Sequence, residues 1–113
     1  MVLKAGEKIH VIVRRRWEDD VRRHFVGEVT EATENVSRVK GYVFVFNAAK
    51  YEKVKRPELR DRIVSLTDSG NIINIIPTTV DLDKVSYQMS KERRLIFTDG
   101  EFSLDVNEFG ASF

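Results

Sequence analysis

The sequence predicts an all-β fold, a small antiparallel β-barrel or half-barrel of about seven to eight short strands. Three features support it: apolar and polar residues alternate with a period of two, β-branched and aromatic residues gather in these short runs, and turn-forming residues separate the runs. A barrel is favoured because short strands with exposed edges invite aggregation. A two-sheet β-sandwich is the alternative architecture.

The chain length and composition indicate one domain, residues 1–113. Its 42% hydrophobic and 33% charged residues are typical of a globular rather than a disordered protein. The chain has no cysteine, which excludes disulfides, thiol nucleophiles and thiolate metal sites. The longest apolar run, residues 42–46, is far shorter than the ~20 residues that cross a bilayer. With no signal-like apolar stretch at the start, we expect a soluble, cytoplasmic protein without membrane contact.

The first two strands are predicted near residues 9–13 and 25–29, joined by a hairpin with its tip at residues 18–20. In that register Val13 faces Phe25 and the pairs that follow continue one apolar face. The same register brings arginines opposite one another in the distal part of the hairpin, where like charges destabilise the pairing.

The next strand is predicted over residues 39–46 and is apolar on both faces, which is typical of a central strand. Tyr42, Phe44 and Phe46 form an aromatic stripe on one face. This stripe is either core or the floor of a ligand cavity. Residues 48–56 are polar and are predicted to form at most one helical turn.

The remaining strands are predicted at residues 63–66, 72–76, 85–89, 95–98 and 102–106. A turn at residues 68–71 is expected to pair Leu66 with Ile73. The Asp-Gly sequence at residues 99–100 predicts a two-residue type I′ turn that pairs Phe97 with Phe102. In the same register an attractive ion pair joins Arg94 to Asp105.

Charge is unevenly distributed along the chain, although the net charge is only +1. Residues 38–62 hold eight Lys/Arg against three acids, and residues 63–113 hold four against eight. Such asymmetry favours a polyanionic partner or self-association.

The first hairpin is the main candidate for anion binding. Its guanidinium groups would bind phosphates or carboxylates, and Trp17 would offer a stacking face. Alternatively, the acids at residues 18–20 neutralise the arginines on a solvated loop. The candidate residues of this hairpin are Arg14, Arg15, Arg16, Trp17, Arg22 and Arg23.

A second basic stretch covers residues 50–57 and is followed by Arg60 and Arg62. Basic residues interleaved with an aromatic residue suit a nucleic-acid surface, and a solvated connection is the alternative. The candidate contacts are Lys53, Lys55 and Arg56. Convergence of the two basic segments on one face would strengthen the anion-binding interpretation.

His10 and His24 are predicted on one face of the first hairpin, about 13 Å apart at the usual strand rise, with a structural role. A hydrogen bond from His10 to Glu28 is expected. Asp81 and Asp83 are interpreted as a capped turn rather than a cation site. No metal, cofactor or catalytic residue is predicted.

The sequence does not determine the function. The first hypothesis is a small non-catalytic interaction or scaffold domain, with a protein partner or self-association favoured over nucleic acid. The second is a nucleic-acid-binding small β-barrel that uses the arginine-rich hairpin. The third is a small-molecule-binding barrel, or an enzyme, with a pocket walled by Tyr42, Phe44 and Phe46.

Overall fold

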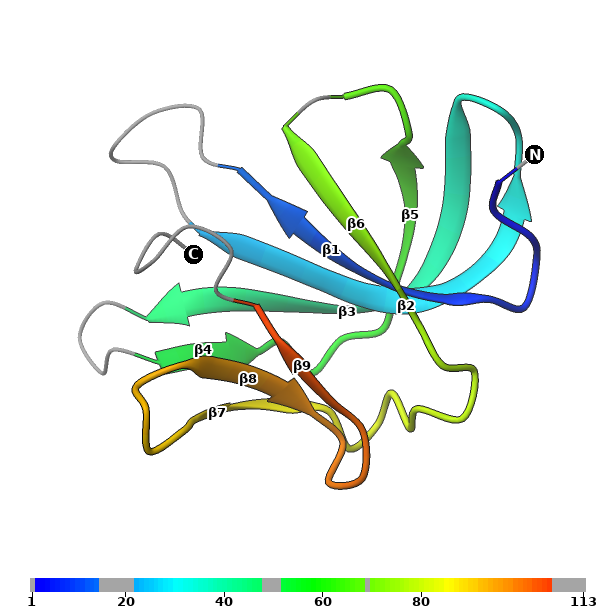
Figure 1. The fold of residues 1–113 in the computed structure, drawn as a ribbon. Coiled ribbons are helices and arrows are strands. Elements are labelled where there is room, and N and C mark those ends of the chain that lie inside the picture. Colours follow the sequence, from blue (N-terminus) through cyan, green and yellow to red (C-terminus); the bar gives the residue numbers. More distant parts are fainter. Residues whose placement is uncertain (1, 15–21, 48–51, 69, 107–113) are drawn as a thin grey trace.

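The computed structural model describes residues 2–14, 22–47, 52–68 and 70–106, in which all the regular structure is antiparallel β (Figure 1). The strands of this part of the chain are β1 Lys8–Val13, β2 Arg23–Ala32, β3 Val36–Asn47, β4 Glu52–Lys55, β5 Arg60–Ser65, β6 Asn71–Ile76, β7 Ser86–Met89, β8 Leu95–Thr98 and β9 Ser103–Asp105. The all-β prediction is therefore confirmed. No helix in the described ranges is long and apolar enough to cross a membrane.

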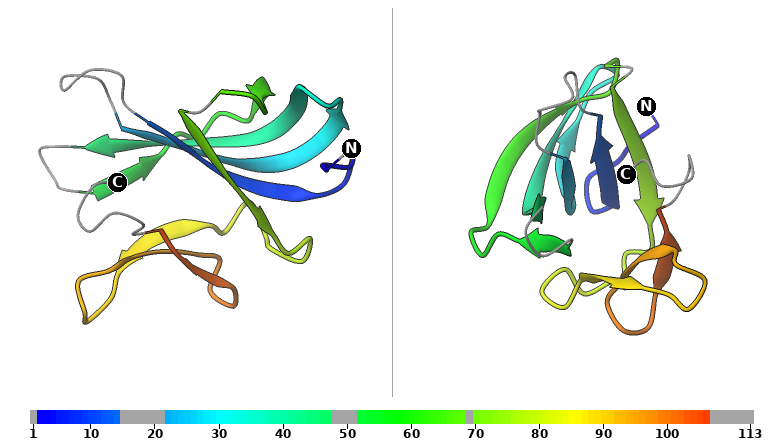
Figure 2. Two further views of the ribbon diagram at one scale, coloured as in Figure 1. Left: turned by 45° about the horizontal axis from the view of Figure 1, so that its top comes forward. Right: turned by 90° about the vertical axis from the view of Figure 1, so that its left-hand side faces the viewer.

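The strands form a large, strongly curved sheet and a small sheet that packs against one of its faces (Figure 2). The large sheet has the order β4-β3-β2-β1-β6, and β5 pairs with the first half of β3 while β4 pairs with the second half. The small sheet has the order β7-β8-β9. Neither sheet closes over the described residues, so the predicted barrel is not confirmed.

The two faces of the large sheet bury separate hydrophobic clusters, because successive side chains of a strand point to opposite faces. We call the face toward the small sheet the sandwich face; its cluster joins Ile12, Val26 and Phe44 to Phe97 of β8. We call the other the opposite face; its buried cluster is Leu3, Ile9, Val11, Phe25, Val29, Val39, Val43 and Val64. The aromatic stripe of β3 therefore lies on the sandwich face, where Phe44 belongs to the cluster and Tyr42 packs against it.

Strands β2 and β3 approach each other closely at the directly paired residues Gly27 and Gly41. A Cβ atom at Gly41 would lie 1.8 Å from the carbonyl oxygen of Val26. One at Gly27 would lie 2.6 Å from the carbonyl oxygen of Lys40. Only glycine permits this approach.

The register predicted for the first hairpin is wrong by two residues, although the faces are right. Val11 pairs with Phe25 and Val13 with Arg23. A slip of two residues leaves every side chain on its original face, so the alternation of apolar residues could not distinguish the two registers.

The second predicted hairpin forms its turn but not its ladder: β5 pairs with β3, and β6 pairs with β1. The turn is held by the Asp68 carboxylate, which accepts a hydrogen bond from the amide of Gly70. The single helical turn expected over residues 48–56 is also wrong in its described part, because residues 52–55 form β4 against β3.

The third hairpin has a longer loop than predicted. The carboxylate of Asp99 accepts hydrogen bonds from the amides of Glu101 and Phe102, and the ladder begins at Thr98 and Ser103. Phe97 therefore pairs with Leu104 rather than with Phe102. The predicted ion pair between Arg94 and Asp105 does form.

Candidate binding site at the basic end of the large sheet

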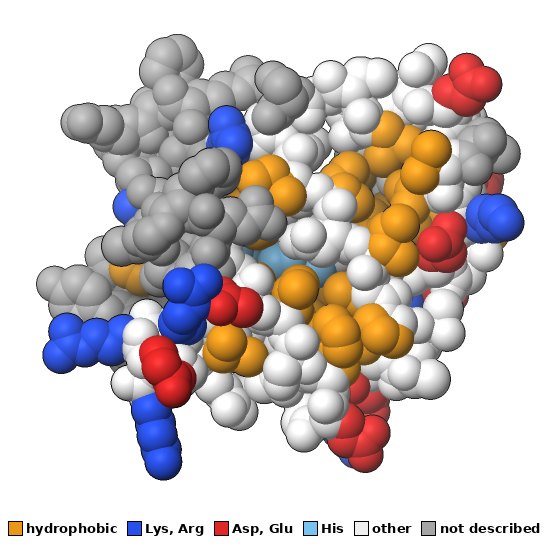
Figure 3. Space-filling model, in the orientation of Figure 1, with side chains coloured by type: hydrophobic (Ala, Val, Ile, Leu, Met, Phe, Trp, Pro, Cys, Tyr) orange, Lys and Arg blue, Asp and Glu red, His pale blue; other side chains and the backbone are white. Residues whose placement is uncertain are grey.

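The fold brings the two basic segments of the sequence together at one end of the large sheet. Arg14 follows β1, Arg22 and Arg23 lie at the start of β2, and Lys53, Lys55 and Arg56 lie on or after β4. Because β3 pairs with both β2 and β4, these segments are neighbours. Figure 3 shows Lys and Arg side chains on the side of the molecule where β3 ends and β4 begins, and also over the loop between β7 and β8. Arg15, Arg16 and Trp17, the other candidates of the first hairpin, lie outside the described residues.

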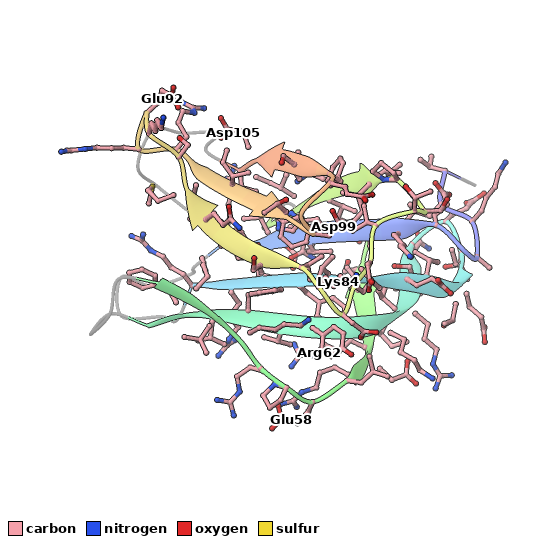
Figure 4. All side chains as sticks on the ribbon, turned by 90° about the horizontal axis from the view of Figure 1, so that it is seen from below. Glu58, Arg62, Lys84, Glu92, Asp99 and Asp105 are labelled. Carbon is pink, nitrogen blue, oxygen red and sulfur yellow. The ribbon has the colours of Figure 1, made fainter. Side chains whose placement is uncertain are left out.

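On the opposite face, arginines of β2 and β5 lie close together. The Arg62 guanidinium lies 5.7 Å from the centre of the Phe25 ring. Burial lowers the pKa of Arg62, and the positive charges of Arg60 and Arg23 lower it further. Glu58 approaches both Arg60, at 3.8 Å, and Arg56, at 4.0 Å, and so joins Arg56 to this group. Figure 4 shows Arg62 and Glu58 on the far side of the molecule from Glu92 and Asp105 of the small-sheet region. We call Arg23, Arg56, Arg60 and Arg62 the arginine face.

On the sandwich face, cations cover the aromatic stripe. Arg22 and Lys53 lie 5.8 and 5.9 Å from the centre of the Phe46 ring. Lys55 lies 4.2 Å from the centre of the Tyr42 ring and donates hydrogen bonds to the carbonyl oxygens of Leu82 and Asp83. Burial, followed by the charge of Arg22, lowers the pKa of Lys53 to about 8.

The two histidines are core residues of the sandwich face, 0% and 1% exposed. The Tyr87 hydroxyl of β7 lies 2.6 Å from Nε2 of His10 and 2.5 Å from Nδ1 of His24. The Asn74 amide nitrogen lies 3.4 Å from Nδ1 of His10. The predicted bond from His10 to Glu28 is wrong, because His10 pairs with Val26 in the observed register.

The predicted separation of the histidines is wrong as well, since their ring centres are only 5.2 Å apart. Burial, followed by the charge of Lys53, lowers the pKa of His10 to about 3. The same two causes, with a further contribution from His10, lower the pKa of His24 to about 2. Burial raises the pKa of Tyr87. All three groups are therefore neutral at physiological pH.

Sequence reasoning missed Tyr87 and Asn74 as partners of the histidines. They are 77 and 64 residues from His10 in the chain, so their approach depends on how the sheets pack. The one local signal is that a buried imidazole needs hydrogen-bond partners. Tyr87 also packs against the Phe44 ring at 4.9 Å between centres, which locates β7 over the stripe.

The pocket hypothesis for Tyr42, Phe44 and Phe46 is not favoured by their positions. Phe44 is 1% exposed and belongs to the core. Tyr42 lines a groove of about 580 Å³ with Lys8, Lys40 and the turn at residues 79–83, and its hydroxyl donates to Asp83.

The acids of this turn form the expected capped structure. The Asp81 carboxylate accepts a hydrogen bond from the amide of Asp83, and the amide of Asp81 donates to the Asp99 carboxylate. In the described ranges no three His, Asp or Glu side chains come together as a metal-binding group. Comparisons with models of protein families, with curated proteins and with solved structures found no match to this chain.

Proposed function

We propose that this chain is a non-catalytic binding domain whose arginine face recognises an acidic segment of a partner protein. The proximity of arginines from β2 and β5 carries the proposal: the Arg62 guanidinium lies 5.7 Å from the centre of the ring of Phe25, which is two residues from Arg23 on the same face of β2. Clustered guanidinium groups repel one another, and carboxylates placed between them relieve the repulsion through paired, charge-assisted hydrogen bonds.

The state of the histidines supports binding rather than acid–base catalysis. A general base works best with a pKa near the working pH. Burial, with the charge of Lys53, holds the pKa values of His10 and His24 near 3 and near 2. Both rings are enclosed in the core, where they suit a structural role.

An acidic protein segment is favoured over single-stranded nucleic acid because cations cover the described aromatic rings at this end. Bases would stack on open aromatic faces. Arg62 covers Phe25, and Arg22 and Lys53 lie over Phe46. Carboxylates need only the guanidinium groups. A cytoplasmic setting, which the lack of cysteine favours, belongs to the same proposal.

Nucleic acid is the second candidate, since guanidinium clusters also bind backbone phosphates. The convergence of the two basic segments, through β2, β3 and β4, favours it over the small-molecule hypothesis. Phosphate contacts alone would give affinity with little sequence preference.

The test compares labelled polyglutamate with single-stranded RNA of matched charge by fluorescence anisotropy, at low and moderate salt. We expect polyglutamate to bind more tightly, and the double variant Arg23→Glu with Arg56→Glu to weaken binding at least about tenfold, which is ~1.4 kcal/mol. The matched control, Lys4→Glu with Lys91→Glu, makes the same change in net charge outside the arginine face and should change the affinity far less.

Tighter binding of RNA at moderate salt would overturn the acidic-segment proposal in favour of nucleic acid. Equal weakening by the two double variants would show that only net charge matters and that the arginine face is not a binding surface.

A further inference from the structure

Two buried nitrogen atoms on the sandwich face have no hydrogen-bond partner among the described residues: Nε2 of His24 and Nζ of Lys53. Their strands, β2 and β4, flank β3 on its two sides, and both residues lie on the sandwich face. His24 pairs with Phe44 and Lys53 pairs with Phe46, two residues further along the same face of β3. The charge of Lys53 lowers the pKa of His24, as expected for neighbouring groups.

The order of hydrogen bonds through the histidines determines which atom of His24 carries a proton. We assign the Asn74 amide nitrogen, which lies 3.4 Å from Nδ1 of His10, as the donor of that bond, so that neutral His10 carries its proton on Nε2 and donates to the Tyr87 oxygen. The Tyr87 hydroxyl then donates to Nδ1 of His24. Neutral His24 therefore carries its proton on Nε2, for which the described part of the chain supplies no acceptor.

Both open groups are consequently donors. A Lys ammonium donates three hydrogen bonds and accepts none, and Lys53 lies over the Phe46 ring, as Arg22 does. An unsatisfied buried donor destabilises the fold, and a buried charged donor destabilises it more. A negatively charged acceptor would satisfy both open donors at once.

We propose that His24 and Lys53 form a binding site for a compact oxyanion, the carboxylate or phosphate group of a small molecule. The neutral His24 imidazole donates through Nε2, the Lys53 ammonium supplies charge, and Arg22 adds to the positive field. The site lies on the sandwich face, apart from the arginine face, so it goes beyond the interaction with an acidic partner and does not depend on it.

The test is an NMR titration of the imidazole signals of the full chain with sodium acetate and with inorganic phosphate. Sodium chloride keeps the ionic strength constant. We expect a saturable shift of the His24 Nε2 proton with at least one anion. Saturation by acetate alone identifies a carboxylate ligand, and saturation by phosphate alone identifies a phosphoryl ligand.

Two variants locate the site. Lys53→Met keeps the apolar stem of the side chain. It should lower the affinity for the anion at least about tenfold, because it removes the charged partner of a buried contact. Lys55→Met, the matched control on the same strand, should leave the titration unchanged. The double variant of the arginine face should also leave it unchanged, which separates this proposal from the previous one.

An absence of any saturable shift with either anion would overturn the proposal. So would an unchanged affinity in Lys53→Met, because the anion would then bind elsewhere.

Discussion

The two faces of the large sheet bury their side chains in cores of different chemistry. The sandwich face keeps His10 and His24 inside its core, and Tyr87 from the small sheet bonds to both. The opposite face buries side chains such as Val29 and Val39, at 1% and 0% exposure. The comparison shows that alternation fills both faces, but only one of them requires a specific polar partner from a distant strand.

Because one core is hydrogen-bonded and the other is apolar, we expect different changes to destabilise the two faces. A hydrogen-bonded core responds to protonation and to the loss of a single atom, since low local polarity makes an unpaired group costly. An apolar core responds to volume, because interiors are close-packed. The predictions below separate these two sensitivities.

The largest expected effect is acid unfolding through the sandwich face. Unfolded histidines bind protons below a pKa of 6.5, whereas folded His10 and His24 remain neutral down to about 3 and about 2. Above pH 6.5 the histidines therefore do not reduce the free energy of unfolding. Below pH 6.5 the free energy of unfolding falls as the pH decreases, because the unfolded chain binds protons that the folded chain does not. Over about two pH units the two histidines account for roughly 5 kcal/mol. Urea titrations across this range measure the loss.

The variant His10→Gln serves as the control for acid unfolding, because glutamine does not titrate in this range. It should lose about half of the pH dependence. If the free energy of unfolding of the wild-type chain is constant from pH 6.5 to about pH 4.5, His10 and His24 are not held neutral in the folded state, and this account is contradicted.

A smaller loss is expected for Tyr87→Phe, which keeps the ring against Phe44 and removes the hydroxyl between the histidines. Two buried imidazole nitrogens lose their partner, at a cost of about 3 kcal/mol. Chemical denaturation measures the change. Tyr42→Phe is the matched control: its hydroxyl bonds to Asp83 at the surface, so its removal should cost much less. If both variants lose the same free energy of unfolding, the buried hydroxyl of Tyr87 contributes no more than the surface hydroxyl of Tyr42, and the prediction fails.

The smallest of these effects is expected on the opposite face. Val39→Ala removes two methyl groups from the fully buried side chain of β3 and should cost about 2 kcal/mol through lost burial and a cavity. Unlike Tyr87→Phe, this loss should be the same at pH 7.5 and pH 5.5, because no titrating group belongs to this cluster. A pH-dependent loss would show that the two faces are coupled.

Local patterns predicted much of this fold. Alternation located β1 to β3 and assigned Val11 and His10 to opposite faces, as observed. The turn signals at Asp68 and Asp99 mark real turns. The first register failed because a slip of two residues preserves every face, so alternation does not determine it.

Long-range features could not be predicted from these patterns. Strand β4 is polar, with cations on both sides of Val54, and only its pairing with β3 makes it a strand. The approach of His24 to Lys53 depends on that unforeseen strand. The bonding of His10 to Tyr87 depends on how the small sheet packs, which no local pattern encodes.

The central claim is that the sandwich face holds a chain of hydrogen bonds that ends in an open N–H at His24. A long-range ¹H–¹⁵N spectrum of the imidazoles at about pH 6 tests it directly. With the Asn74 amide nitrogen as the donor to His10, the hydrogen-bond chain predicts two neutral rings, each with its proton on Nε2 and an accepting Nδ1. An imidazolium at either position, or a His24 proton on Nδ1, would contradict it.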